Sequence, residues 1–116
     1  MAEDETLFER IIAREIPADI VHETERTLAF RDISPQASTH VLVVPKKRYR
    51  NLAELAAADP NLLAEVATTA AEVAAAEGIA ESGYRVVFNT EANAGQTVFH
   101  VHAHLLGGEQ LGQFGR

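Results

Sequence analysis

The chain has 116 residues, of which 47% are hydrophobic, and these values are typical of one globular domain with a modest core. It contains no cysteine, which excludes disulfide bonds, thiolate metal sites and a cysteine nucleophile. Its formal net charge of −7 argues against non-specific binding to nucleic acid, which depends on Lys and Arg to neutralise phosphates.

The start of the chain predicts no targeting segment. The first residues are acidic and lack the apolar stretch of a signal peptide. No apolar run in the sequence approaches the ~20 residues that a membrane span needs. We therefore expect a cytoplasmic protein with no membrane partner.

A short helix is predicted near the N-terminus. Thr6 and Glu9 fit the Thr-x-x-Glu capping box, in which each side chain bonds the backbone N–H of the other residue. Apolar residues follow at helical spacing, which predicts a helix near residues 7–14. Pro17 limits how far this helix can extend.

The strand signals are β-branched and apolar runs bounded by turn residues. They predict strands at residues 20–23, 27–31, 40–44, 84–89 and 98–106. No strand–helix–strand alternation is present, and several strands lie close enough to pair as hairpins. The order therefore predicts an α+β fold with a mostly antiparallel sheet of about five strands.

One long helix is predicted between the third and fourth strands, after a short helical turn from Asn51. Asp59 is a suitable N-cap, Pro60 suits the first helical position, and Gly78 is a natural C-terminal stop. One helical face is apolar, formed by Leu63, Val66, Ala70, Val73 and Ala74. This face is expected to cover one side of the sheet and to leave the other side partly open.

A basic cluster follows the third strand. It consists of Lys46, Lys47, Arg48 and Arg50. We interpret it as a solvated turn rather than a nucleic-acid site. A milder functional role would be to reduce the negative field that an anionic substrate meets.

A row of histidines marks the last strand, because three of the five histidines in the chain lie within five positions. In a strand, His100, His102 and His104 would share one face and the intervening apolar residues the other. No packing requirement calls for three imidazoles in a row, so we expect the row to have a chemical role. A purely structural row is the simplest alternative.

A metal site is the second alternative. His-x-His on a strand suits zinc. His100 and His104, however, would lie ~13 Å apart between Cα atoms, which is too far for both to reach one ion with ease. A third ligand would more naturally come from elsewhere, and His40 is the obvious candidate.

Nucleophilic catalysis is the third alternative. A neutral imidazole attacks phosphorus well and forms a covalent phosphohistidine-type intermediate. Neighbouring imidazoles lower one another's pKa and so favour the neutral form near pH 7. The Thr97 hydroxyl and the Gln96 amide stand just before the row and could hold a phosphate. The central histidine has an imidazole on each side that can hold its tautomer or contact phosphate, so this reasoning favours His102 as the nucleophile.

Residues 96–108, Gln-Thr-Val-Phe-His-Val-His-Ala-His-Leu-Leu-Gly-Gly, resemble the His-φ-His-φ-His-φ-φ signature of the histidine triad (HIT) superfamily. The flanking residues are similar to the Hint branch, the histidine triad nucleotide-binding proteins. Further segments resemble that branch in the same order, at 8–12, 15–18, 28–37, 39–40, 43–47 and 83–87. The resemblance implies a single HIT domain over residues 1–116, with one long helix and a short N-terminal helix.

The resemblance also implies a function. Such proteins are purine nucleoside phosphoramidases or nucleotidyl hydrolases, which cleave P–N bonds of adenosine phosphoramidates, also act on aminoacyl adenylates, and need no metal or other cofactor. It places His102 as the nucleophile, and His104 and His40 as phosphate-contacting and proton-relay residues. His100 would order the row and position the nucleophile through its carbonyl. The implied partners are an AMP-type purine nucleotide and a second copy of the chain in a homodimer.

The resemblance further assigns the nucleotide-binding residues. Asp32 matches the carboxylate that accepts hydrogen bonds from the ribose hydroxyls. The apolar base pocket is matched by Leu7, Phe8, Ile11, Phe30 and Ile33. Ribose and phosphate contacts are matched by Asn89, Gln96 and Thr97.

One segment departs from the family pattern. Many members end in an aromatic, proline-containing tail that helps set leaving-group preference, whereas residues 109–116 here read Glu-Gln-Leu-Gly-Gln-Phe-Gly-Arg. The substrate range therefore stays open. The alternatives are a dinucleoside polyphosphate hydrolase of the fragile-histidine-triad type, a nucleotide-binding regulatory module with incidental activity, and a metal enzyme.

Overall fold

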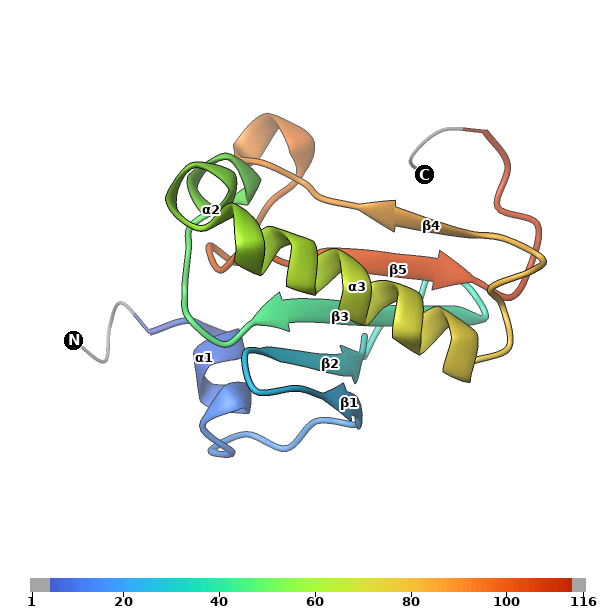
Figure 1. Cartoon of the computed structure of the whole chain (residues 1–116), viewed down its shortest axis with the longest axis horizontal. Coiled ribbons are helices and arrows are strands. Elements are labelled where there is room, and N and C mark those ends of the chain that lie inside the picture. Colours follow the sequence, from blue (N-terminus) through green and yellow to red (C-terminus); the bar gives the residue numbers. More distant parts are fainter. Residues whose placement is uncertain (1–4, 114–116) are drawn as a thin grey trace.

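The computed structural model describes residues 5–113, so the first four residues and the last three residues of the tail lie outside it. The elements in chain order are α1 (Leu7–Ile12), β1 (Ile20–Glu23), β2 (Thr27–Arg31), β3 (Thr39–Pro45), α2 (Leu52–Ala58), α3 (Pro60–Ala76), β4 (Tyr84–Val87), the 3₁₀ turn η2 (Ala92–Ala94) and β5 (Ala103–Gly107). The strands form one antiparallel sheet in the order β1-β2-β3-β5-β4, which confirms the predicted α+β class (Figure 1). Within this range, no helix combines the length and the apolar character that crossing a membrane requires.

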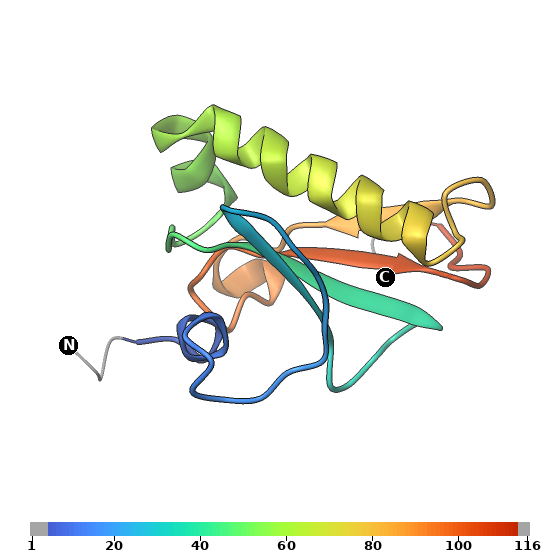
Figure 2. The ribbon, with the colours of Figure 1, turned by 60° about the horizontal axis from the view of Figure 1, so that its bottom comes forward.

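The two faces of the sheet have different covers. Figure 2 shows α3 along one face and α1 with η2 on the other. All seven residues of β3 are buried, because this central strand has neighbours on both sides and both faces. The core beneath α3 includes Ala29, Val41, Val43, Val66, Val73 and Leu105. The core on the α1 face consists of Phe8, Ile11, Leu28, Phe30, Leu42 and Val44. The alternation along β2 and β3 thus supplies both layers.

The limits of α3 follow from its capping residues, as the sequence predicts. The Asp59 carboxylate accepts the Leu62 N–H at 3.0 Å, and Pro60 occupies the first turn. Gly78, just beyond the C-cap, has a φ of 76°, a conformation that side chains with a Cβ rarely adopt. The buried stripe differs at two places, because Leu62 rather than Leu63 is its first buried residue and because Thr69 is also buried.

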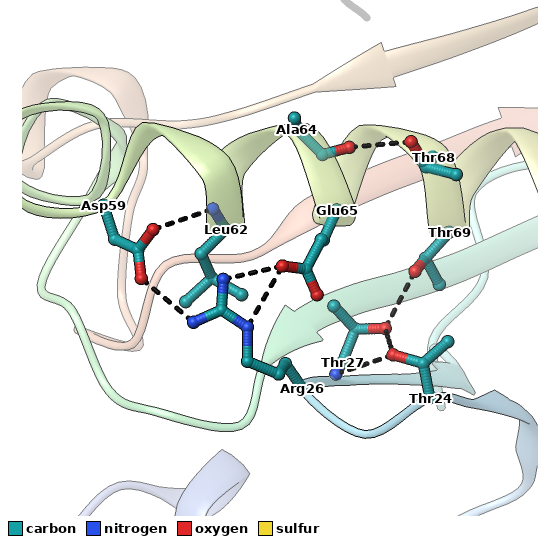
Figure 3. A network of polar contacts seen from close by, with 9 residues as sticks. All are labelled: Thr24, Arg26, Thr27, Asp59, Leu62, Ala64, Glu65, Thr68 and Thr69. Atoms are coloured by element: carbon teal, nitrogen blue, oxygen red, sulfur yellow. Dashed lines mark hydrogen bonds and ion pairs between the residues drawn. The ribbon is translucent and has the colours of Figure 1, made fainter.

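A polar network fastens the β1–β2 turn to α3 (Figure 3). Arg26 donates from Nη1 to Asp59 at 3.0 Å and from Nη2 to Glu65 at 2.6 Å. Beneath it, the Thr27 hydroxyl lies 2.8 Å from the Thr69 hydroxyl, and both of these residues are buried. The hairpin therefore joins α3 through a partly buried ion-pair cluster and a buried hydroxyl contact.

The expectation for the last strand is wrong at its start. It predicted residues 98–106, whereas β5 covers Ala103–Gly107. The β3–β5 register pairs Val43 with Ala103, so its continuation would place Pro45 opposite Val101. Proline has no N–H to donate to a ladder. The Val101 N–H instead donates to the Tyr49 carbonyl at 2.8 Å, so residues 98–102 contact the loop after β3 and do not continue the ladder.

Two other elements are shorter than predicted. The first helix was expected near residues 7–14 but ends at Ile12, because Arg14 has a φ of 64° and leaves the helical conformation. The strand expected at 84–89 ends at Val87, whose β5 partner is His104. Both differences concern only where these two elements end, and they leave the sheet topology unchanged.

The basic cluster after β3 is not a simple solvated turn. Lys46 pairs with Glu23 at 2.7 Å, Arg48 with Glu9 at 3.2 Å, and Arg50 with Glu91 at 2.7 Å. These carboxylates come from β1, from α1 and from the loop after β4. The cluster therefore links three distant parts of the chain to the segment that follows β3.

Candidate functional site

A cavity of about 310 Å³ opens on the α1 face of the sheet. Its apolar wall includes all five residues that the sequence assigned to a base pocket, namely Leu7, Phe8, Ile11, Phe30 and Ile33. Phe8, Ile11 and Phe30 are buried, whereas Ile33 is 93% exposed at the rim. Sequence reasoning missed Ile16, Pro17, Ala18, Leu42 and Val98, which also line the cavity. Three of them belong to the connection after α1, where residues 15–18 resemble the family but carry no local signal that marks them as cavity residues.

Polar groups gather at one end of this cavity. Asp32 and Thr97 line it together with His102 and His104. Asp32 follows β2, Thr97 lies in the loop before β5, and His104 belongs to β5. The fold thus brings together one carboxylate, one hydroxyl and two imidazoles from separate segments.

His100 is fully buried and organises the start of the histidine row. Its Nε2 lies 2.7 Å from the Pro45 carbonyl, and a carbonyl can only accept, so the proton is on Nε2. Its Nδ1 is buried without a partner among the described residues. Burial lowers the pKa of His100, so its ring is neutral near pH 7.

His102 has a single well-defined tautomer. Its Nδ1 lies 2.8 Å from the His100 carbonyl, so Nδ1–H donates and Nε2 keeps its lone pair. The Phe8 ring contacts it edge-on, with centroids 4.8 Å apart. Burial lowers the pKa of His102, so the lone pair is available near pH 7. His102 therefore presents a neutral, oriented nitrogen at the polar end of the cavity.

His40 and His104 form a hydrogen-bonded pair whose direction is also fixed. The Gln36 N–H donates to His40 Nδ1 at 3.0 Å, which places the His40 proton on Nε2. That Nε2–H donates to His104 Nδ1 at 2.9 Å, so the His104 proton is on Nε2. Burial lowers the pKa of His40, and burial together with the neighbouring His102 and His40 lowers that of His104 to about 4. His104 is thus a neutral hydrogen-bond donor at the cavity.

One group of side chains within residues 5–113 could meet at a metal ion. Asp32, His40 and His104 each have a ligand atom within 4.8 Å of the others. The Gln36 N–H, however, occupies His40 Nδ1 and leaves the proton on the Nε2 that would have to bind the ion. This arrangement favours a proton-bearing network over metal binding.

Two of the predicted contact residues do not line the cavity. Gln96 is buried, and its amide accepts the Glu91 N–H at 2.7 Å and donates to the Arg50 carbonyl at 2.8 Å. Its side chain is therefore used to shape the loop rather than to meet a ligand. Asn89 is partly buried and is not part of the cavity wall. Asp32 does line the cavity, and its Oδ1 also accepts the Ser34 N–H at 2.8 Å.

Comparison with known proteins identifies relatives that match almost the whole chain. The family model described as HIT domain matches residues 13–111. The purine nucleoside phosphoramidase of Escherichia coli (strain K12) is 50% identical over 109 residues, which cover 94% of this chain and 92% of that protein. An uncharacterized HIT-like protein of Synechococcus elongatus is 53% identical over 111 residues, with 96% of each chain covered.

Solved structures give the same result. A HIT family hydrolase from Clostridium thermocellum superposes with a TM-score of 0.91 at 44% identity and covers 95% of this chain and 96% of its own. A HIT family hydrolase from Legionella pneumophila has a TM-score of 0.88 at 48% identity, with 91% and 95% covered. The similarity therefore includes the sheet, α3 and the histidine-bearing segment.

Proposed function

The chain belongs to the HIT domain family and is a nucleotide hydrolase, and from this premise we propose that it is a purine nucleoside phosphoramidase. In this proposal it cleaves P–N bonds of adenosine phosphoramidates, and acts on aminoacyl adenylates, through a nucleotidyl-His102 intermediate. The observation that carries the proposal is the His102 tautomer. Its Nδ1–H is held by the His100 carbonyl at 2.8 Å, which leaves the Nε2 lone pair for a phosphorus atom in the cavity.

The cavity can hold an AMP-type group in one orientation. The apolar wall around Phe8 and Phe30 has the character that a purine base needs, and Ile33 at the rim would cover it. Asp32 lines the same cavity, and its carboxylate lies within 4.8 Å of a His104 ring nitrogen, so it can accept from ribose hydroxyls there. The phosphate would then lie against Thr97 and the two cavity histidines.

The first chemical step follows from the fixed protons. His102 Nε2 attacks phosphorus and forms a P–N bond, while the bond to the leaving amine breaks and its electron pair stays on the amine nitrogen. That nitrogen takes a proton from a water molecule in the cavity, which is held by the His104 Nε2–H. The water becomes a hydroxide on the side from which the amine departs, and the His40–His104 pair keeps both of its protons. The His100 carbonyl stabilises the positive charge that develops on the His102 ring, because it accepts the Nδ1–H.

The second step releases the nucleotide. The hydroxide attacks phosphorus, the bond to His102 breaks, and the electron pair returns to Nε2. The other proton of the original water has already passed to the amine, so every imidazole ends in its starting protonation state. The products are a nucleoside monophosphate, a free amine and the enzyme in its starting state.

Replacement of the nucleophile tests the proposal. The His102→Ala variant should lose at least ~10³-fold in kcat on adenosine phosphoramidate and should form no covalent adduct in rapid-quench mass spectrometry. His22→Ala is the matched control, because His22 lies on β1 and pairs with Glu72 at 3.2 Å. Turnover near the wild-type rate in His102→Ala would refute the mechanism.

A substrate comparison separates the alternatives. Purified protein receives adenosine phosphoramidate, an aminoacyl adenylate and diadenosine polyphosphate side by side. We expect the highest kcat/KM for the phosphoramidate. Preference for the polyphosphate would indicate a dinucleoside polyphosphate hydrolase, and negligible turnover of every substrate with tight AMP binding would indicate a regulatory module. Loss of activity after exhaustive chelation would contradict the metal-free proposal.

We also propose that residues 1–116 form one domain that works in the cytoplasm as a homodimer. The support for the dimer is β4, an edge strand on which Tyr84 is 37% and Val86 is 40% exposed. An unpaired, partly apolar edge favours association with a second copy. Val86→Lys should shift the sedimentation of the protein from dimer towards monomer, and a wild-type monomer would contradict this part.

A further inference from the structure

We propose that Arg48 is a positioning residue that fixes the orientation of the His102 ring by joining α1 to the loop before β5. The inference rests on the proposed function for its effect on catalysis, although its structural part does not. Arg48 follows β3 and is not among the residues that line the cavity. It acts on His102 through two other segments.

The first connection is to the loop. Arg48 Nε donates to the Phe99 carbonyl at 3.1 Å. This carbonyl belongs to the peptide group that joins Phe99 to His100. A rotation of that peptide plane would change the direction of the next carbonyl, which holds His102 Nδ1–H at 2.8 Å.

The neighbouring carbonyls show why this contact is needed. Three consecutive carbonyls accept from side chains: Val98 from Gln96 Nε2 at 3.1 Å, Phe99 from Arg48, and His100 from His102. This stretch lies outside β5, so no ladder sets these peptide planes. The His100–Val101 plane is also held by the Val101 N–H, which donates to the Tyr49 carbonyl at 2.8 Å. The Phe99–His100 plane before it is held at its carbonyl by Arg48.

The second connection is to α1. Arg48 Nη1 lies 3.2 Å from Glu9 Oε1, and the same oxygen accepts the Thr6 N–H at 2.9 Å in the capping box. A six-residue helix is too short to be stable alone, so its position depends on such contacts. Phe8, next to Glu9, is the residue whose ring contacts the His102 ring. One guanidinium therefore ties together the carbonyl side and the aromatic side of His102.

The geometry requires the planar fork of arginine. Nε and Nη1 donate to acceptors on two different segments, and the single ammonium of lysine cannot reproduce both directions. The side chain is 35% exposed, and exposed ion pairs add little to stability. Loss of Arg48 should therefore disturb the site much more than the fold.

The test uses Arg48→Met with Arg10→Met as the matched control. Arg10 lies on α1, but its ion pair is with Glu5 at 3.4 Å, within the same N-terminal segment. In Arg48→Met we expect kcat to fall about tenfold and KM to change less than twofold, because a small misorientation of the nucleophile slows the chemical step. The thermal midpoint should stay within about 5 °C of wild type. Arg10→Met should match wild type in all three, and Arg48→Lys should resemble Arg48→Met.

A spectroscopic readout separates this inference from the proposed function. Two-bond ¹H–¹⁵N correlation should show His102 as the pure Nδ1–H tautomer in wild type and as a mixture of tautomers in Arg48→Met. This result does not depend on which substrate is cleaved. A single unchanged tautomer in Arg48→Met would overturn the inference, whether or not kcat falls.

A second variant serves if Arg48→Met does not fold. Glu9→Gln keeps the capping box, which accepts Glu or Gln at this position, but weakens the bond to Arg48. It should show the same tautomer mixture with a smaller loss of kcat. Wild-type kcat and a single tautomer in Glu9→Gln would equally overturn the inference.

Discussion

Consecutive residues from 101 to 105 serve the two faces of the sheet in different ways. Val101, Ala103 and Leu105 are buried among apolar side chains on the α3 side, where contact is non-directional. His102 and His104 line the cavity on the other side, where each ring nitrogen matters individually. The α3 face therefore depends on volume and buried area, whereas the cavity face depends on where each proton lies. Substitutions on the two faces should separate stability from turnover.

The largest effect on turnover outside His102 is expected at His104. In the proposed mechanism the His104 Nε2–H holds the water that protonates the leaving amine, so His104→Ala should lower kcat about 10²- to 10⁴-fold. The thermal midpoint should change little, because the apolar layer under α3 is intact. Steady-state kinetics and a melting curve test both points. A kcat within threefold of wild type would show that another group holds that water.

The largest effect on stability is expected on the opposite face. Leu105 is fully buried, and Leu105→Ala leaves a cavity in the core beneath α3. The free energy of unfolding should fall by about 2–5 kcal/mol in urea titrations. The kcat of the remaining folded protein should stay near wild type. A loss of turnover with unchanged stability would contradict the expectation that the α3 face determines stability and the cavity face determines turnover.

As the pH is lowered from 7, the first loss of stability should come from the histidines on the cavity face. His40, His100, His102 and His104 have lowered pKa values in the folded state, so the unfolded chain binds their protons more readily. Their contribution is complete above the unfolded pKa of about 6.5 and is lost as pH falls through the folded values. Urea midpoints should therefore decrease between pH 7 and pH 5.

Carboxylates affect stability at lower pH than the histidines do, so they serve as an internal reference. Arg50 and Asn51 lower the pKa of Glu91 to about 2, so its contribution is lost only well below the ordinary value of 4.5. A decrease in stability between pH 7 and pH 5 therefore reports the histidines. A flat profile in that window would contradict their neutral, buried state.

The smallest effect is expected in the hydroxyl contact between β2 and α3. Thr69→Val removes the 2.8 Å contact with Thr27 but keeps the shape of the side chain, so it should cost about 1 kcal/mol. Thr68→Val is the matched control, because its exposed hydroxyl bonds only within α3 among the contacts in Figure 3. Thr68→Val should be close to neutral in the same urea titration. Equal effects of the two variants would show that the buried contact adds nothing.

Local signals predicted the elements whose cause is local. The Thr6–Glu9 box and the Asp59–Pro60 start act over three or four residues, so the sequence indicates them directly. The start of the histidine strand depends on Pro45, which is distant in sequence, and the expected strand therefore began too early.

Long-range polar contacts were harder to predict for the same reason. Arg48 and Glu9 are 39 positions apart, and Arg50 and Glu91 are 41 apart, so no spacing rule connects them. The groups that fix the tautomers of the histidines are backbone atoms of Gln36, Pro45 and His100. Backbone atoms are the same in every residue, so residue identity gives no signal for them.

The bond from the Gln36 amide to His40 has a kinetic consequence. A peptide N–H does not release its proton at ordinary pH, so the chain Gln36–His40–His104 is closed at its inner end. Every proton that leaves His104 must return through the cavity itself. The pair therefore exchanges protons only with the contents of the cavity and cannot draw on the interior of the protein.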